Sequence, residues 1–133
     1  AFKPSLLNFL ATSFGIIGGA CCIGVAFTPA DLLLQAHIFF ANGIFRGLCI
    51  ASVLYSILIF KKDDMDNKYA YGFIVFGLMV LVYILISELG PNPRLNPDAL
   101  KLQVVSQKII TLWLFLSIYF YSLGLGKHLY SKS

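Results

Sequence analysis

Residues 31–60 read DLLLQAHIFFANGIFRGLCIASVLYSILIF, and this stretch is apolar on almost every side. An α-helix of about thirty residues rises about 45 Å, which exceeds the roughly 30 Å of a bilayer's hydrocarbon core. One charged residue, Arg46, lies near the middle of the stretch. A charge at that depth is costly and usually faces protein or water. The stretch therefore predicts a membrane-spanning helix that must shield a cation.

The composition of the whole chain agrees with a membrane protein. Of its 133 residues, 59% are hydrophobic and 12% are charged, whereas soluble domains have about 45–50% apolar and about 25% charged residues. Most basic residues flank the apolar stretches, a pattern typical of membrane anchoring rather than of a nucleic-acid surface. The three cysteines lie within apolar stretches and lack the spacing of a metal site or a redox motif. We therefore expect a lipid bilayer, and no nucleic acid, as a partner.

Turn-forming residues divide the chain into four apolar spans, covering residues 5–27, 32–60, 69–89 and 98–126. Pro29 and Asp31 follow the first span, and Asp31 is expected to cap the second helix. The polar loop KKDDMDNK, residues 61–68, follows the second span, and GPNP at residues 90–93 ends the third. Asn96 and Pro97 read as the cap and first residue of the fourth helix. The sequence predicts one transmembrane domain, residues 1–133, with an all-α fold: an antiparallel, up-down, four-helix transmembrane bundle.

The distribution of basic residues predicts the orientation of this bundle. Four spans place both termini and the 61–68 loop on one side of the membrane. That side carries six Lys and Arg residues against three on the other side. Basic residues favour the cytoplasmic side, so we expect both termini to lie there. The six are Lys3, Lys61, Lys62, Lys68, Lys127 and Lys132, and the three are Arg94, Lys101 and Lys108.

Small residues recur at four-residue spacing in the first two spans, as Ala11, Gly15 and Gly19 and as Gly43, Gly47 and Ala51. Such stripes let two helix backbones approach closely in lipid. Counting from the middle of each span puts Gly15 level with Gly47, and Gly19 level with Gly43. We predict that the two stripes meet, although glycine is also simply common in membrane helices.

Arg46 and Asn42 are one turn apart and share a helix face. We expect the Arg46 guanidinium to lie inside the bundle or against another subunit. Glu88 is the one acidic residue well inside a span, but it starts about 13 Å further out by the helical rise. A direct pair with Arg46 is therefore marginal, and backbone carbonyls, water, a lipid headgroup or a partner chain are the expected acceptors.

Counting outward from mid-membrane also places His37, Glu88, Gln107 and Lys108 at one depth near the outer boundary. Ionisable groups at membrane depth are candidate functional residues. The alternative is ordinary polarity where the helices meet the headgroups. His37 and Glu88 supply fewer ligands than the three protein ligands of a catalytic zinc site. We therefore predict no cofactor, no metal site and no catalytic residues.

Several short runs resemble one family pattern. They are GVAFTPAD at residues 24–31, His37, FFA at residues 39–41 and QKI at residues 107–109. The pattern is similar to that of uncharacterised polytopic membrane families related to the damage-regulated autophagy modulators. In those families a glycine-rich span ends in a Phe-Pro-x-Asp-like turn, followed by a His with small and aromatic residues. The resemblance covers about a third of the chain and implies no catalytic role, and those families usually have more than four spans.

The sequence predicts a multi-pass integral membrane protein whose most favoured role is a non-catalytic accessory or structural subunit of a larger membrane complex. Short loops and the absence of a recognisable catalytic motif favour this role. The alternative is a small transporter or a lipid-handling protein that uses the outer polar layer. A membrane enzyme is the third class, and the motifs support it least.

Overall fold

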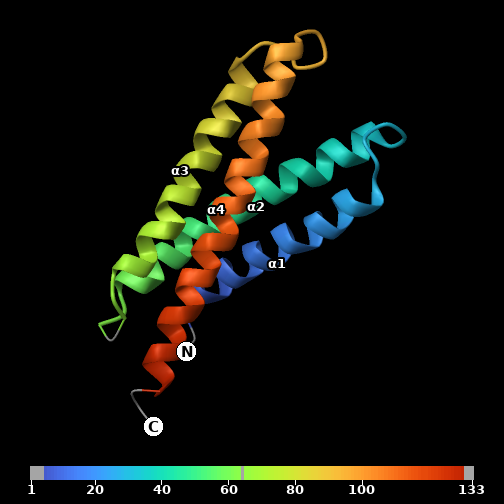
Figure 1. Ribbon diagram of the computed structural model, residues 1–133. Coiled ribbons are helices and arrows are strands. Elements are labelled where there is room, and N and C mark those ends of the chain that lie inside the picture. The colour runs from blue at the N-terminus through green and yellow to red at the C-terminus, as the bar shows by residue number, and fades with distance from the viewer. Residues whose placement is uncertain (1–4, 64, 131–133) are drawn as a thin grey trace.

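The computed structural model describes residues 5–63 and 65–130, so Lys3 and Lys132 of the charge count lie outside the described residues. Four helices follow one another along the chain: α1 (Leu6–Phe27), α2 (Leu34–Phe60), α3 (Lys68–Leu89) and α4 (Pro97–Tyr130). They run alternately up and down (Figure 1), so the predicted all-α, up-down, four-helix fold is confirmed. All four are long and apolar enough to cross a membrane, by length and composition.

The ends of the helices follow local capping chemistry, with one exception to the prediction. The Ser5 hydroxyl accepts a hydrogen bond from the Asn8 N–H at the start of α1, and the Asn96 side chain accepts from two N–H groups at the start of α4. The prediction that Asp31 caps α2 is wrong. The Pro29 carbonyl accepts hydrogen bonds from the N–H groups of residues 32 and 33. This extra turn delays α2 until Leu34, which has no side-chain cap.

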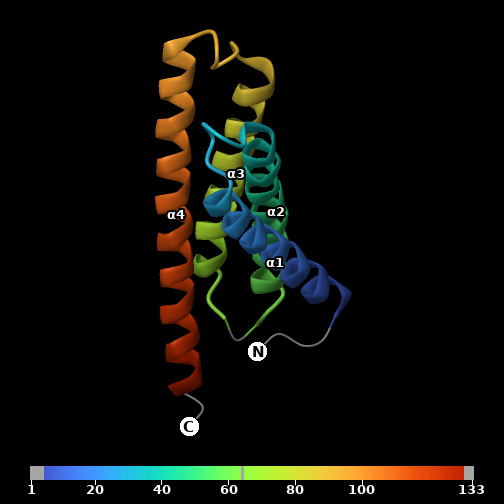
Figure 2. The same cartoon turned by 90° about the vertical axis from the view of Figure 1, so that its right-hand side faces the viewer.

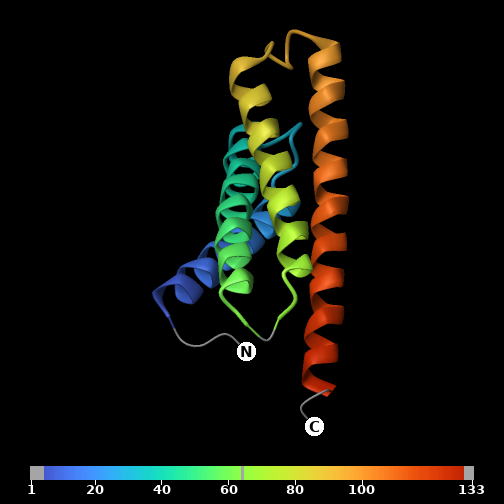
Figure 3. The ribbon, with the colours of Figure 1, turned by 90° about the vertical axis from the view of Figure 1, so that its left-hand side faces the viewer.

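Each helix packs on the next one in the chain, and the bundle is open between α1 and α4. Within the described residues, no Cα atoms of α1 and α4, of α1 and α3 or of α2 and α4 come within 8 Å of each other. Figures 2 and 3 show the first turns of α1 splayed away from α4, on the far side of α2. The two helical hairpins therefore cross at an angle (Figure 1), and they contact each other through α2 and α3.

The core lies along α3 in two groups of buried side chains. The central group is formed by Phe76, Val80, Tyr83 and Ile110, against which side chains of α2 and α4 pack. The other group, Ile59, Met65, Ala70 and Phe73, lies near the connection between α2 and α3. Aromatic rings of α3 thus join the α2 and α4 neighbours into one unit.

The α1–α2 contact is a close backbone approach at Gly47, but its partner differs from the prediction. A Cβ atom at Gly47 would lie 3.3 Å from the Gly18 backbone and 3.3 Å from the Phe14 carbonyl oxygen. Gly43 faces the Cys21 side chain instead of Gly19. A Cβ at Gly15 or Gly19 would meet nothing within 4 Å, so the predicted pairs Gly15/Gly47 and Gly19/Gly43 are wrong.

The reason for this error is helical geometry. An α-helix has 3.6 residues per turn, so a strict four-residue stripe rotates around the helix by about 40° at each step. The observed α1 face instead alternates three- and four-residue steps: Ala11, Phe14, Gly18 and Cys21. Ala11 and Ala51, the outer members of the two predicted stripes, are both buried.

Candidate functional site

Arg46 forms an ion pair with Glu88 across the outer face of α2 and α3. Its Nη2 atom donates to Glu88 Oε1 at 2.9 Å. The two side chains are 58% and 60% exposed, so the guanidinium does not lie inside the bundle, and the other expected position, against another subunit, stays a prediction. The sequence estimate of their separation assumed upright helices. However, α2 has 27 residues and crosses α3 at an angle (Figure 1). Because the helices are tilted, Arg46 and Glu88 differ less in depth than counting residues suggests. Their long side chains span the distance that is left.

The ion pair lies within an exposed stripe of α2. Asn42, one turn before Arg46, is exposed on the same face. The neighbouring positions of this stripe, Phe39, Ile50 and Val53, are exposed and apolar. We call these five α2 residues, together with Glu88, the ion-pair face. It presents polar side chains between apolar ones, near the middle of α2.

The predicted outer polar layer divides into separate contacts. The Nδ1–H of His37 donates to the Thr28 carbonyl at 2.6 Å, which closes the α1–α2 turn. The Thr28 hydroxyl donates in turn to the Gly24 carbonyl at 2.8 Å. Glu88 belongs to the ion-pair face, and Lys108 is exposed. His37 therefore holds a turn together.

Gln107, the last member of that layer, belongs to a polar cluster that was not predicted from the sequence. Its Nε2 donates to the Tyr83 hydroxyl at 2.6 Å, and the Gln103 Nε2 donates to the same oxygen at 3.2 Å. Tyr83 is only 8% exposed, and its ring lies 4.7 Å from that of Phe45, centroid to centroid. The four-residue spacing of Gln103 and Gln107 could have indicated a shared partner across the seam.

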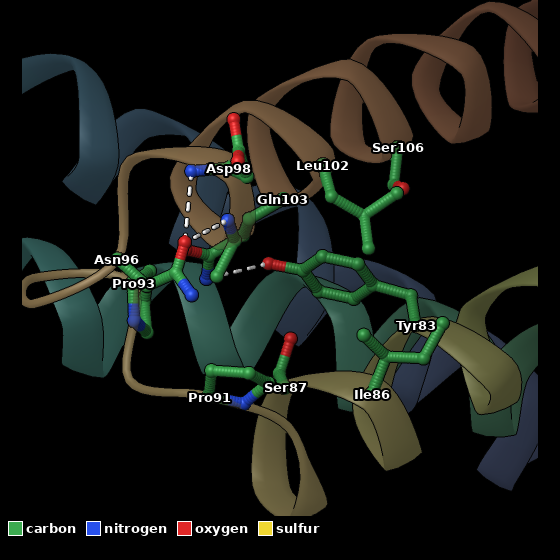
Figure 4. Close-up of a pocket in the computed structure, with 11 residues that line it drawn as sticks. Tyr83, Ile86, Ser87, Pro91, Pro93, Asn96, Asp98, Leu102, Gln103 and Ser106 are labelled. Carbon is green, nitrogen blue, oxygen red and sulfur yellow. Dashed lines mark hydrogen bonds between the residues drawn. The ribbon is translucent and has the colours of Figure 1, made fainter.

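A cavity of about 270 Å³ opens beside this cluster, where α3 ends and α4 begins. In Figure 4, Leu102 and Ser106 of α4 face one side of the Tyr83 ring, and Ile86 and Ser87 of α3 face the other. Pro91, Pro93 and Asn96 of the connecting turn close its outer end. Hydroxyl and amide groups thus meet apolar walls at the membrane boundary.

The charges near this cavity are few and lie at its rim. Of the described residues in its lining, Asp98 alone is charged, and its carboxylate lies 3.5 Å from the Lys101 ammonium. The first N–H groups of α4, which could bind an anion, already donate to the Asn96 side chain. Among residues 5–63 and 65–130, no group of three or more His, Cys, Asp or Glu side chains is placed to hold a metal ion.

These features define a multi-pass integral membrane protein with two polar sites, one on the exposed face of α2 and α3 and one within the α3–α4 seam. Comparisons with protein-family models, curated proteins and solved structures gave no match. The resemblance to families related to the damage-regulated autophagy modulators therefore stays a prediction that rests on the quoted residues.

Proposed function

We propose that this protein is a non-catalytic accessory or structural subunit of a larger membrane assembly and that it docks through the ion-pair face. The observation that carries the proposal is the exposure of Arg46 and Glu88, whose side chains are more than half exposed although Arg46 occupies the centre of α2. An arginine at the centre of a membrane helix costs about 2.5–3.5 kcal/mol on insertion scales. A partner helix over this face would replace acyl chains with polar or small groups.

The surroundings of the ion pair support the same function. The Asn42 amide offers both donors and an acceptor to a partner. Phe39 and Ile50 add exposed apolar surface on either side of it along α2. Interhelical hydrogen bonds and close packing, rather than a hydrophobic effect, hold helices together in lipid. The polar residues of the ion-pair face can supply the hydrogen bonds, and the apolar residues around them can supply the close packing.

Photo-crosslinking in the native membrane tests this function. A photoreactive residue at Ile50 should join the chain to a distinct partner, while the same residue at Ile16, which is exposed on α1, should not. Arg46→Leu should abolish the crosslink and release the partner on purification in mild detergent. The matched control is Arg94→Leu, which removes an exposed arginine from the α3–α4 turn.

The double variant Arg46→Leu/Glu88→Leu separates docking from folding. Removing both charges leaves no unpaired group, and the isolated chain should unfold at the wild-type temperature. Loss of the partner with a folded chain supports the subunit function. Retention of the same crosslinked partner in both Arg46 variants would contradict it.

A second candidate function is a small transporter or lipid-handling protein, which the cavity beside Tyr83 favours. Its mixed lining of hydroxyl, amide and apolar groups lies at the boundary where a lipid head would enter. Reconstitution into vesicles tests this function directly. Accelerated transfer of a fluorescent lipid by a homo-oligomer of this chain would favour the second function over the first.

A further inference from the structure

The seam between α3 and α4 contains a second cavity next to the first one. It has a volume of about 350 Å³ and shares Tyr83, Ile86 and Ser106 with the cavity of about 270 Å³. We call the smaller one the head cavity and the larger one the tail groove. The shared residues place the two spaces next to each other along the seam, beside Tyr83.

The tail groove is lined by side chains suited to a hydrocarbon chain. Apart from the three shared residues, its lining is apolar: Val75, Leu78, Met79, Val82, Ile109 and Ile110. From Val75 to Ile86 the helix rises about 16 Å. This direction runs from the middle of α3 towards its carboxyl end, so the groove extends from mid-membrane to the boundary.

The head cavity offers hydrogen bonds without a cation. The Tyr83 oxygen accepts two amide N–H groups, so its own hydroxyl hydrogen is left to donate. The Ser87 hydroxyl and the Gln103 amide line the same space (Figure 4). The described residues that line the cavity include no Lys or Arg, and Asn96 already accepts hydrogen bonds from the N–H groups at the start of α4. A phosphate or carboxylate therefore finds no cation in this lining to offset its charge, whereas a neutral hydroxyl or carbonyl head needs only the hydrogen bonds.

We propose that the α3–α4 seam binds one molecule of an uncharged lipid. Its head, which bears hydroxyl or ester carbonyl oxygens, lies in the head cavity between Tyr83, Ser87 and Gln103. Its tail lies in the tail groove and points to the middle of the membrane, as lipid tails do in a bilayer. The proposal shares its cavity with the second candidate function but concerns binding alone. It is tested separately from docking, because the head cavity is lined by α3, α4 and the turn between them, whereas Arg46 lies on α2.

Photolabelling of the purified full chain in detergent tests the proposal. The probe is a monoacylglycerol with a diazirine in its acyl chain. It should label peptides from residues 75–87 and 99–110, and excess unlabelled monoolein should compete. Tyr83→Phe should reduce labelling about two- to tenfold, the effect of one net hydrogen bond. Ser106→Leu should reduce it further, because Ser106 lines both spaces.

Matched controls are Tyr119→Phe and Ser122→Leu, which change exposed residues of α4 outside both cavities. Circular dichroism and thermal unfolding establish which variants fold. If Ser106→Leu does not fold, Ser87→Leu fills the head cavity from an exposed position. Undiminished labelling of the folded cavity variants would overturn the proposal. Equal labelling by a phosphatidylglycerol probe would also overturn it, since that result describes a general lipid annulus. Both results leave the subunit function untouched, because its test uses Arg46.

Discussion

The two helical hairpins of this protein are packed in different ways. In the α1–α2 hairpin the backbones themselves touch, because Gly47 lies against Gly18 and leaves no room for a side chain. The α3–α4 hairpin also has a close approach, since a Cβ at Gly72 would lie 3.1 Å from the Ser117 Oγ atom, but aromatic side chains form hydrogen bonds across its seam. Trp113 donates to the Gly72 carbonyl at 3.1 Å, and Tyr83 receives two glutamine amides. Cavities remain beside both contacts.

The difference shows how residue size determines what a helix seam can do in lipid. Glycine permits close backbone packing, which maximises van der Waals contact and excludes a guest. Large rings touch at a few points and leave spaces between them, and a polar group in such a space must find a partner. In this chain the α1–α2 hairpin has its close backbone contact at Gly47, and a cavity of about 410 Å³ lies where α1 and α2 face α3 and α4. The α3–α4 seam has cavities along its own length, which a ligand could fill.

The largest loss of stability is expected from a substitution that separates α1 from α2. Gly47→Leu places a large side chain against the α1 backbone at Gly18 and Phe14, which cannot yield as a flexible side chain would. Overpacking of this kind costs about 1–3 kcal/mol, occasionally more. Thermal unfolding in detergent should show a clear loss of stability. Gly19→Leu is the matched control, since a Cβ there meets nothing within 4 Å. Equal destabilisation by the two variants would contradict the observed register.

The next largest loss of stability is expected from a change at Tyr83, in the α3–α4 seam. Tyr83→Phe keeps the ring against Phe45 but removes the oxygen that accepts from Gln103 and Gln107. Two amide groups then lose an acceptor, and stranding a buried polar group costs about 1–3 kcal/mol. The triple variant Tyr83→Phe/Gln103→Leu/Gln107→Leu should recover part of this loss, because it strands no amide. A triple variant less stable than Tyr83→Phe would show that the amides serve another contact.

A smaller loss of stability is expected from a change at Trp113, at the other end of the α3–α4 seam. Trp113→Phe removes one hydrogen bond to the Gly72 carbonyl. That carbonyl keeps its helical hydrogen bond within α3, so nothing is stranded. We expect a loss of about 0.5–1.5 kcal/mol in thermal unfolding, less than for Tyr83→Phe. The reverse order would mean that the ring of Trp113, rather than its N–H, holds the seam.

The smallest effect concerns the connection between the hairpins, outside the membrane. The Lys68 ammonium and backbone N–H bond the Asp66 carboxylate and hold its pKa below that of an ordinary aspartate. The folded chain therefore binds its proton at lower pH than the unfolded chain. The contribution is complete above the ordinary aspartate pKa of about 3.9 and is lost as the pH falls through the lowered value.

Asp66→Asn should thus lower stability slightly at neutral pH, and the difference from wild type should shrink below about pH 4. Stability measured against pH checks this sign, with Asp63→Asn in the same loop as a comparison. Because the Asp66–Lys68 pair is exposed to water, high salt should also reduce the difference. A difference that grows on acidification would contradict the lowered pKa.

The sequence by itself determined the membrane fold. Span length, turn residues and the Asn96–Pro97 start of α4 follow from local chemistry, and so does the role of Gly47 as a contact residue. These features depend on the length of an apolar run or on one residue's own size and capping group. None requires knowledge of which neighbour lies opposite.

Only the tertiary structure decided which faces meet. Lipid and protein interior are equally apolar, so a helix that is hydrophobic all round does not reveal its buried side. For that reason the sequence favoured Gly15 where Gly18 makes the contact. Counting residues also ignored helix tilt, which brings Glu88 to Arg46. Tyr83 carries no signal along its own helix, because its partners Gln103 and Gln107 become visible only when α4 packs beside α3.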